Sequence, residues 1–206
     1  MTRFRAKQAR GAILLAAGAS TRMGCVKLLL PWKNSTLLEH SIEELKQSEI
    51  DFIVVVLGAN RDVIGEKVNF EGIDVVVNSE WRKGMATSIA SGVRFLVKKK
   101  PEIQSILVAL ADQPLLDTKY YNKLIDKSLI SKNKIVASSY ADQLGVPAIF
   151  DRDYFDNLLN LEGSKGARAL LRGGRVNVIS VNAGELALDL DTREAYNSLY
   201  QQHGRL

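Results

Sequence analysis

Short runs of continuous apolar residues recur along the first two thirds of the chain, and amphipathic segments separate them. The runs lie at residues 12–16, 52–57, 73–77, 105–110 and 134–138. Because apolar residues fill these runs without alternating with polar ones, the runs predict strands that are covered on both faces. Strands of this kind are typical of parallel sheets, in which a helix crosses over between successive strands.

The segments between the runs have the spacing of helices. Thr36 and Glu39 match a capping box, and the apolar residues that follow them lie on one helical face. Residues 85–97 and 118–129 show the same periodicity. The alternation predicts an α/β fold of three layers, α/β/α, with a doubly wound, mostly parallel, Rossmann-like sheet.

The last third of the chain departs from this alternation. An apolar segment at 146–150 precedes helical patterns near 151–159 and 164–172, a strand at 176–181 and a helix from about residue 192. We interpret this part as a segment that leaves the sheet, returns to it and ends in the helix from about residue 192. No internal repeat or linker interrupts the 206 residues, so we expect one domain, 1–206.

Composition and charge narrow the classes of function. The net charge of +5 comes from cations scattered along the chain, without the interleaved aromatic residues of a nucleic-acid-binding face. The one cysteine, Cys25, excludes an internal disulfide and is typical of a reducing compartment. The first ten residues lack the apolar core of a signal peptide, and no apolar stretch reaches the ~18–20 residues of a membrane span. We therefore expect a cytoplasmic protein that binds neither nucleic acid nor membrane.

The loop after the first predicted strand, within GAILLAAGASTRMGCVKLLLPW at 11–32, has the strongest chemical signal. Gly18 and Gly24 allow backbone N–H groups to approach a phosphate closely, and Arg22 and Lys27 supply positive charge. Five residues separate the two glycines, and Lys27 follows the second by three. This spacing matches neither a Walker loop nor the G-x-G-x-x-G dinucleotide motif.

Carboxylates follow at later strand ends. Asp112 comes just after the strand at 105–110, and Asp189 and Asp191 alternate on an extended segment, which puts them on one face. Carboxylate oxygens suit Mg²⁺. Asp112 also fits a turn, and Asp191 fits a helix cap before Thr192.

Residues 79–93 place a glycine and small hydroxyl side chains at the start of a predicted helix, where a ligand can meet the helix N-terminus. All of these features are predicted at the carboxyl edge of the sheet, where ligands of such folds gather. Together they predict a site for a nucleoside triphosphate with Mg²⁺.

The pattern L-A-A-G-x-S-x-R-M-G-x-x-K at 15–27 resembles the signature loop of nucleotidyltransferases. The chain is most similar to the molybdenum cofactor nucleotidyltransferase family, and within it to the cytidylyltransferase branch. The further segments that carry this resemblance, in the family's order, are KLLLPW at 27–32, GMATSIASGV at 84–93, ADQP at 111–114, GVPAIF at 145–150, GSKGARALL at 163–171 and DLDT at 189–192.

The resemblance implies a nucleotide-diphospho-sugar-transferase-like fold and the transfer of a nucleoside monophosphate from an NTP to a phosphorylated pterin, with release of pyrophosphate. It implies Mg²⁺ as cofactor, and a molybdoenzyme or maturation factor as the client of the product. Residues of about 10–140 would bind the nucleotide, and those of about 141–206 the acceptor and part of the metal.

The resemblance also implies a role for each matching residue. Those implied to be catalytic are Arg22, Lys27 and Asp112. Those implied to bind nucleotide are Leu15, Ala16, Ala17, Gly18, Ser20, Gly24, Gly84 and Ser88; Gly58 is a further nucleotide-binding candidate because it directly follows the predicted strand at 52–57. Those implied to bind the acceptor are Gly145, Val146, Pro147, Lys165 and Arg168. The implied metal ligands are Asp112 and Asp191, with Asp189 as the weaker candidate.

The chain departs from the family pattern mainly on the acceptor side. Val146 stands where many relatives have histidine, Ser164 where aspartate is common, and the segment after Asp191 lacks the family's proline and second acid. Ala17 favours CTP, since the guanylyl branch usually reads LAGG. The alternatives are a GTP-dependent transferase, a transferase for a sugar phosphate or another phosphorylated alcohol, and a cofactor-delivery protein without turnover.

Overall fold

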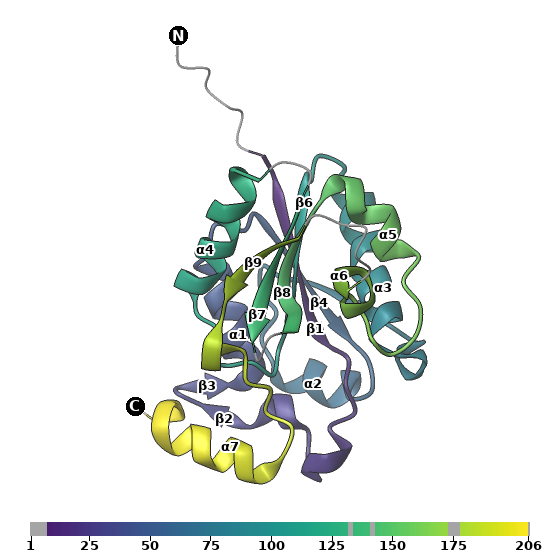
Figure 1. Ribbon diagram of the computed structural model, residues 1–206. Helices are drawn as coiled ribbons and strands as arrows, with labels where there is room; N and C mark the ends of the chain where they lie inside the picture. Colours follow the sequence, from purple (N-terminus) through teal and green to yellow (C-terminus); the bar gives the residue numbers. More distant parts are fainter. Residues whose placement is uncertain (1–7, 132–133, 141–142, 173–177, 206) are drawn as a thin grey trace.

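A computed structural model describes residues 8–131, 134–140, 143–172 and 178–205 (Figure 1). Within these residues, seven strands form one sheet in the order β5-β4-β1-β6-β8-β7-β9. The strands are β1 (Arg10–Ala16), β4 (Phe52–Leu57), β5 (Asp74–Val77), β6 (Ser105–Leu110), β7 (Ile135–Tyr140), β8 (Gln143–Asp151) and β9 (Val178–Asn182).

The predicted mostly parallel sheet is confirmed. β1 lies parallel to β4 and β6, β4 to β5, and β7 to β9. β8 is antiparallel to both of its neighbours, β6 and β7. Only two residues separate β7 from β8 in the sequence, which is too short for the crossover that a parallel pair requires. The strand expected at 176–181 corresponds to β9, although residues 176–177 lie outside the described residues.

Helices connect most of these strands. They are α1 (Leu37–Lys46), α2 (Arg61–Lys67), α3 (Met85–Lys99), α4 (Thr118–Leu129), α5 (Phe155–Leu159), α6 (Arg168–Arg172) and α7 (Arg193–Leu199). The capping box at α1 is confirmed, because Glu39 N donates to Thr36 Oγ1 at 3.3 Å and Thr36 N donates to Glu39 Oε2 at 2.9 Å. The sequence patterns had not indicated α2 or the short pair β2 (Pro31–Trp32) and β3 (Ser35–Thr36).

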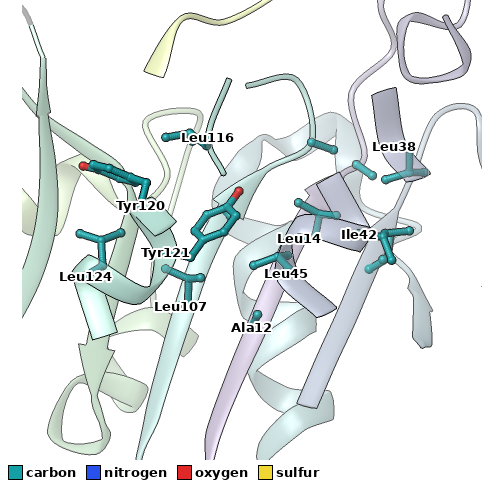
Figure 2. Packing of buried hydrophobic residues seen from close by; sticks show 14 of the residues in the cluster. Ala12, Leu14, Leu38, Ile42, Leu45, Leu107, Leu116, Tyr120, Tyr121 and Leu124 are labelled. Carbon is teal, nitrogen blue, oxygen red and sulfur yellow. The ribbon is translucent and has the colours of Figure 1, made fainter. Parts of the chain in front are cut away.

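Two hydrophobic layers enclose the sheet. On one face, Leu45 of α1 and Tyr121 of α4 belong to the cluster that covers Leu14 of β1 (Figure 2). On the other face, α3, α5 and α6 form a cluster with Ile13 and Leu15 of the same strand. Successive residues of β1 thus face opposite layers, which confirms a three-layer α/β/α architecture.

A third cluster ties the end of the chain to the first loop. Leu190 and Tyr196 pack with Met23 and Trp32, and the Tyr196 hydroxyl donates to the carbonyl oxygen of Pro31 at 2.8 Å. Figure 1 shows α7 beside β2 and β3. This packing carries the segment that contains Asp191 back to the carboxyl edge of the sheet.

None of the described helices has both the length and the apolar composition needed to cross a lipid bilayer.

Candidate active site at the carboxyl edge of the sheet

The loop that follows β1 forms the wall of a cavity of about 270 Å³. Gly18, Ser20 and Arg22 come from this loop, while Lys27 follows it and lies in the short 3₁₀ turn Lys27–Leu29. Ser20 has a φ of 54°, so the backbone turns sharply there into the turn Thr21–Met23. The cavity also contains residues from far along the chain, since Asp112 and Asp191 line it.

An ion-pair network lies in this cavity. Lys27 Nζ is 2.7 Å from Asp112 Oδ2 and 3.3 Å from Asp191 Oδ1, and the Arg22 guanidinium is 3.1 Å from Asp191 Oδ2. Leu190 N donates to the carbonyl oxygen of Asp112 at 3.0 Å, which fixes the two acidic segments side by side. The structure therefore brings together both cations and two of the three aspartates that the sequence singles out.

Asp112 has a free ligand position. Its Oδ1 atom is buried and makes no hydrogen bond to any residue that the structure describes. Within the same residues, no group of three acidic, histidine or cysteine side chains gathers as a metal site. Because Mg²⁺ is often held by one or two carboxylates, with phosphate and water completing its shell, Asp112 and Asp191 fit such an ion.

Asp189 has different surroundings. It accepts a hydrogen bond from Gln113 Nε2 at 2.8 Å, and the backbone turns between the two aspartates because Asp191 N donates to the Asp189 carbonyl. Loss of water around the carboxyl group, together with repulsion from Asp112 and Asp191, raises the pKa of Asp189. Two further cavities lie near the first. Asp189 lines both of these, the second and the third, whereas Asp191 lines the first and the second.

The second cavity, of about 420 Å³, shares Gly18, Arg22 and Asp112 with the first. It extends from Ala17 to the start of α3, where Gly84 and Ser88 line it. The Ser88 side chain is buried, and its hydroxyl accepts a hydrogen bond from Asn78 Nδ2 at 2.9 Å. The end of β5 thus helps to fix the N-terminal part of α3.

The third cavity, of about 370 Å³, shares Asp189 and Ser164 with the second. Lys165, Arg168 and Arg172 line it together with four apolar side chains, those of Met85, Leu110, Val146 and Ala167. Arg168 also donates to the Tyr140 hydroxyl at 3.0 Å, and this hydrogen bond raises the pKa of Arg168. The cavity therefore combines a cationic part with an apolar surface.

The remaining expected site residues lie near these cavities but are absent from the described linings. They are Gly24, Gly58, Gly145 and Pro147. Gly24 has a φ of 65° and ends the turn Thr21–Met23, where a left-handed backbone favours glycine. The Cβ of any other residue at position 58 would lie 2.6 Å from the Ala17 carbonyl oxygen, and one at 145 would overlap the Tyr140 hydroxyl.

Several residues that line these cavities were not among those predicted from the sequence. They include Ala19, Thr21, Trp81, Met85, Leu110, Ser164 and Arg172. A helical spacing of four from Arg168 could have identified Arg172. Trp81 comes three residues before Gly84, but its place in the cavity depends on how the turn Trp81–Lys83 packs on β4.

Comparison with known proteins gives this site its context. The MobA-like NTP transferase domain matches residues 12–179. The chain is 32% identical to the nicotine blue oxidoreductase of Paenarthrobacter nicotinovorans, over 88% of this chain and 92% of that one. It is 26% identical to the molybdenum cofactor cytidylyltransferase of Escherichia coli, over 89% and 92% of the two chains.

Solved structures with a similar fold are found as well. The crystal structure of Rv0371c from Mycobacterium tuberculosis is 29% identical and superposes with a TM-score of 0.82 over 94% of this chain and 98% of that one. The same protein has been solved in complex with manganese. The chain thus has the fold, the signature loop and the overall similarity of nucleotidyltransferases, and it belongs to the MobA-like NTP transferase family.

Proposed function

We propose that this protein transfers cytidine monophosphate from CTP to a phosphorylated pterin of the molybdopterin type, releases pyrophosphate and requires Mg²⁺. The observation that carries the proposal is that the three cavities are neighbours, because the first and second share Asp112 and the second and third share Asp189. They lead from the Lys27 and Arg22 cluster, through the second cavity, to the cationic cavity around Arg168. Two anionic substrates would meet where the cavities join, beside Asp112 and Asp189.

The reaction forms one bond and breaks one. An oxygen of the acceptor phosphate attacks the α-phosphorus of CTP, and the bond between that phosphorus and the bridging oxygen of the pyrophosphate breaks. Such a transfer depends on alignment and on neutralisation of charge, more than on covalent chemistry by the protein. Lys27 and Arg22 supply the neutralising charge, because both project into the first cavity.

Asp112 and Asp191 would hold the metal ion, through the free Oδ1 of Asp112 and the half-exposed carboxylate of Asp191. A divalent cation held by these two carboxylates would supply positive charge that stabilises the negative charge of the phosphates. The carboxylates also pair with Lys27 and Arg22, so the phosphate oxygens would compete with them for these two cations.

The choice of CTP rests on Ala17, which lines the second cavity beside Gly18 and Ser88. If the nucleotide occupies this cavity, the size of the side chain at position 17 limits the base that can enter. Replacing Ala17 with glycine should therefore shift the preference toward GTP, measured as the ratio of kcat/KM for the two nucleotides.

The choice of a pterin acceptor rests on the third cavity and on one relative. Lys165, Arg168 and Arg172 can bind a phosphate, and Met85 with Val146 offers an apolar surface to a flat ring. The relative named molybdenum cofactor cytidylyltransferase has similarity over nearly its whole length. A sugar phosphate or another phosphorylated alcohol is the second candidate, because the same cations would bind its phosphate.

A pyrophosphate-release assay tests these assignments. Purified protein with Mg²⁺ is incubated with CTP or GTP, and with molybdopterin or a panel of phosphorylated alcohols. We expect release with CTP and molybdopterin only. Release that requires a phosphorylated alcohol would transfer the assignment to the second candidate. Tight binding of the pterin dinucleotide without any release would indicate a delivery protein.

A further inference from the structure

The two tryptophans of the chain lie in contrasting places. Trp32 is fully buried in the cluster that holds the C-terminal segment. Trp81 is half-buried and lines the second cavity, together with Ala17, Gly18 and Ser88. One indole ring is therefore part of the protein interior, and the other forms part of the wall of the site.

The position of Trp81 depends on a glycine behind it. A Cβ at Gly58 would lie 2.6 Å from the carbonyl oxygen of Ala17 and 2.9 Å from the Cβ of Trp81. Glycine thus lets the end of β4 fit between the loop after β1 and the turn Trp81–Lys83. Ala59 N also donates to the Ala17 carbonyl oxygen at 3.2 Å, which holds the loop in place. The loop after β1, the end of β4 and the turn Trp81–Lys83 therefore pack against one another, and this packing fixes Ala17 and Trp81 in the wall of the second cavity.

The indole ring has one face covered. The guanidinium carbon of Arg82 lies 4.4 Å from the ring centroid, in the geometry of a cation–π contact. The other face and the ring edge are the parts that can meet a ligand. Trp81 is the one aromatic side chain among the described residues that line this cavity, and its flat apolar surface is suited to stacking against a heterocycle.

We propose that the Trp81 ring is the surface on which the nucleobase of the triphosphate stacks. This inference rests on the proposed function. Trp81 lines the second cavity with Ala17 and Gly18 and is not among the described residues that line the third cavity with Lys165 and Arg168, so it faces the nucleotide and not the acceptor. Stacking adds affinity for any base, because every base has a π-face.

Tryptophan fluorescence gives a direct test, with Trp32 as the matched control. In Trp32→Phe the remaining indole is Trp81, and CTP without acceptor should change its emission. In Trp81→Phe the remaining indole is the buried Trp32, and CTP should leave its emission unchanged. Trp32 suits this design because its indole N–H has no hydrogen-bond partner within the described residues, so phenylalanine there breaks no such bond.

Calorimetric titration measures the contribution of the ring to affinity. Trp81→Ala should raise the Kd for CTP roughly ten-fold or more, and Trp81→Phe, which keeps an aromatic face, should stay within about three-fold of wild type. The Kd for GTP should rise in Trp81→Ala as well. Circular dichroism confirms that each variant is folded.

The outcomes separate this inference from the proposed function. Wild-type protein that binds no nucleoside triphosphate would overturn the proposed function, and this inference with it. Normal CTP binding by folded Trp81→Ala would overturn the inference alone. An emission change in Trp32→Phe that molybdopterin causes and CTP does not would also overturn it, because Trp81 would then face the acceptor.

Discussion

The ammonium group of Lys27 lies 2.7 Å from Asp112 Oδ2, although the two residues are 85 positions apart in the sequence. The same ammonium is 3.3 Å from Asp191 Oδ1, and the Lys27 side chain is buried. A buried cation held between two carboxylates from distant segments links the first loop to the end of β6 and to the C-terminal segment. This contact joins the three parts of the chain that the proposed reaction requires.

Replacing Lys27 with alanine should lower kcat for nucleotidyl transfer by about 10²-fold or more, because a preorganised positive charge is lost from the site. Asp112→Ala should have an effect of similar size. The measurement is the rate of pyrophosphate release at saturating CTP. Lys98→Ala is the matched control, since Lys98 is exposed on α3 and lines none of the three cavities. Near-normal turnover of either site variant would remove that residue from the catalytic role.

Replacing Lys27 with methionine should tighten the binding of Mn²⁺ to the protein in the absence of nucleotide. The lysine neutralises Asp112 and Asp191, and without it these carboxylates attract a divalent cation more strongly. Electron paramagnetic resonance of free Mn²⁺ measures the affinity. Asp112→Asn should weaken the same binding. Unchanged affinity in Lys27→Met would show that the metal binds elsewhere.

Gly58→Ala should destabilise the protein by about 1–3 kcal/mol, because the new methyl group would overlap the Ala17 carbonyl and the Trp81 side chain. Urea unfolding measures the change. The same overlap would push Ala17 and Trp81 apart. Because both residues line the second cavity, the affinity for CTP should fall as well.

Gly65→Ala is the matched glycine control. Gly65 is exposed within α2, and apart from the neighbouring residues and the backbone of its own helix, a Cβ there would have no described atom within 4 Å. The same substitution should stabilise the protein by about 0.5–1 kcal/mol, because alanine favours a helix over glycine. Equal effects at the two positions would contradict the packing argument for Gly58.

Stability should fall as the pH decreases below about 6.5, the ordinary pKa of histidine. Burial is the main reason that the pKa of His40 is lowered. Lys33 lowers it further, whereas the Pro114 carbonyl, 3.0 Å from His40 Nε2, and Glu44 partly oppose the shift. The unfolded chain then binds a proton that the folded protein excludes, so acid favours unfolding. Urea unfolding at pH 7.5 and pH 5.5 measures the difference.

Replacement of His40 tests whether this residue causes the pH dependence of stability. His40→Gln keeps an N–H donor for the Pro114 carbonyl but cannot titrate, so the part of the pH dependence due to His40 should vanish. If His40→Gln keeps the wild-type pH dependence, another group causes it.

Local signals predicted much of the fold. The continuous apolar runs became β1, β4, β5, β6 and β7, and the Thr36 and Glu39 pair caps α1 as expected. The α2 helix was not predicted, since Arg61–Lys67 contains a glycine and only one buried residue, Ile64. The short connection that makes β8 antiparallel to β7 was also missed, because the apolar pattern marks only 146–150, whereas β8 begins at Gln143.

The sequence by itself determined the residue types of the site, since a glycine loop with two cations and strand-end carboxylates can be read from spacing alone. Only the tertiary structure decided which of them meet. Asp191 reaches Lys27 because Leu190 and Tyr196 pack on Met23 and Trp32, whereas Asp189 turns toward Gln113 and Arg168. Which distant segments touch depends on how whole layers of helices and strands pack together. The spacing of apolar residues within one segment does not contain that information.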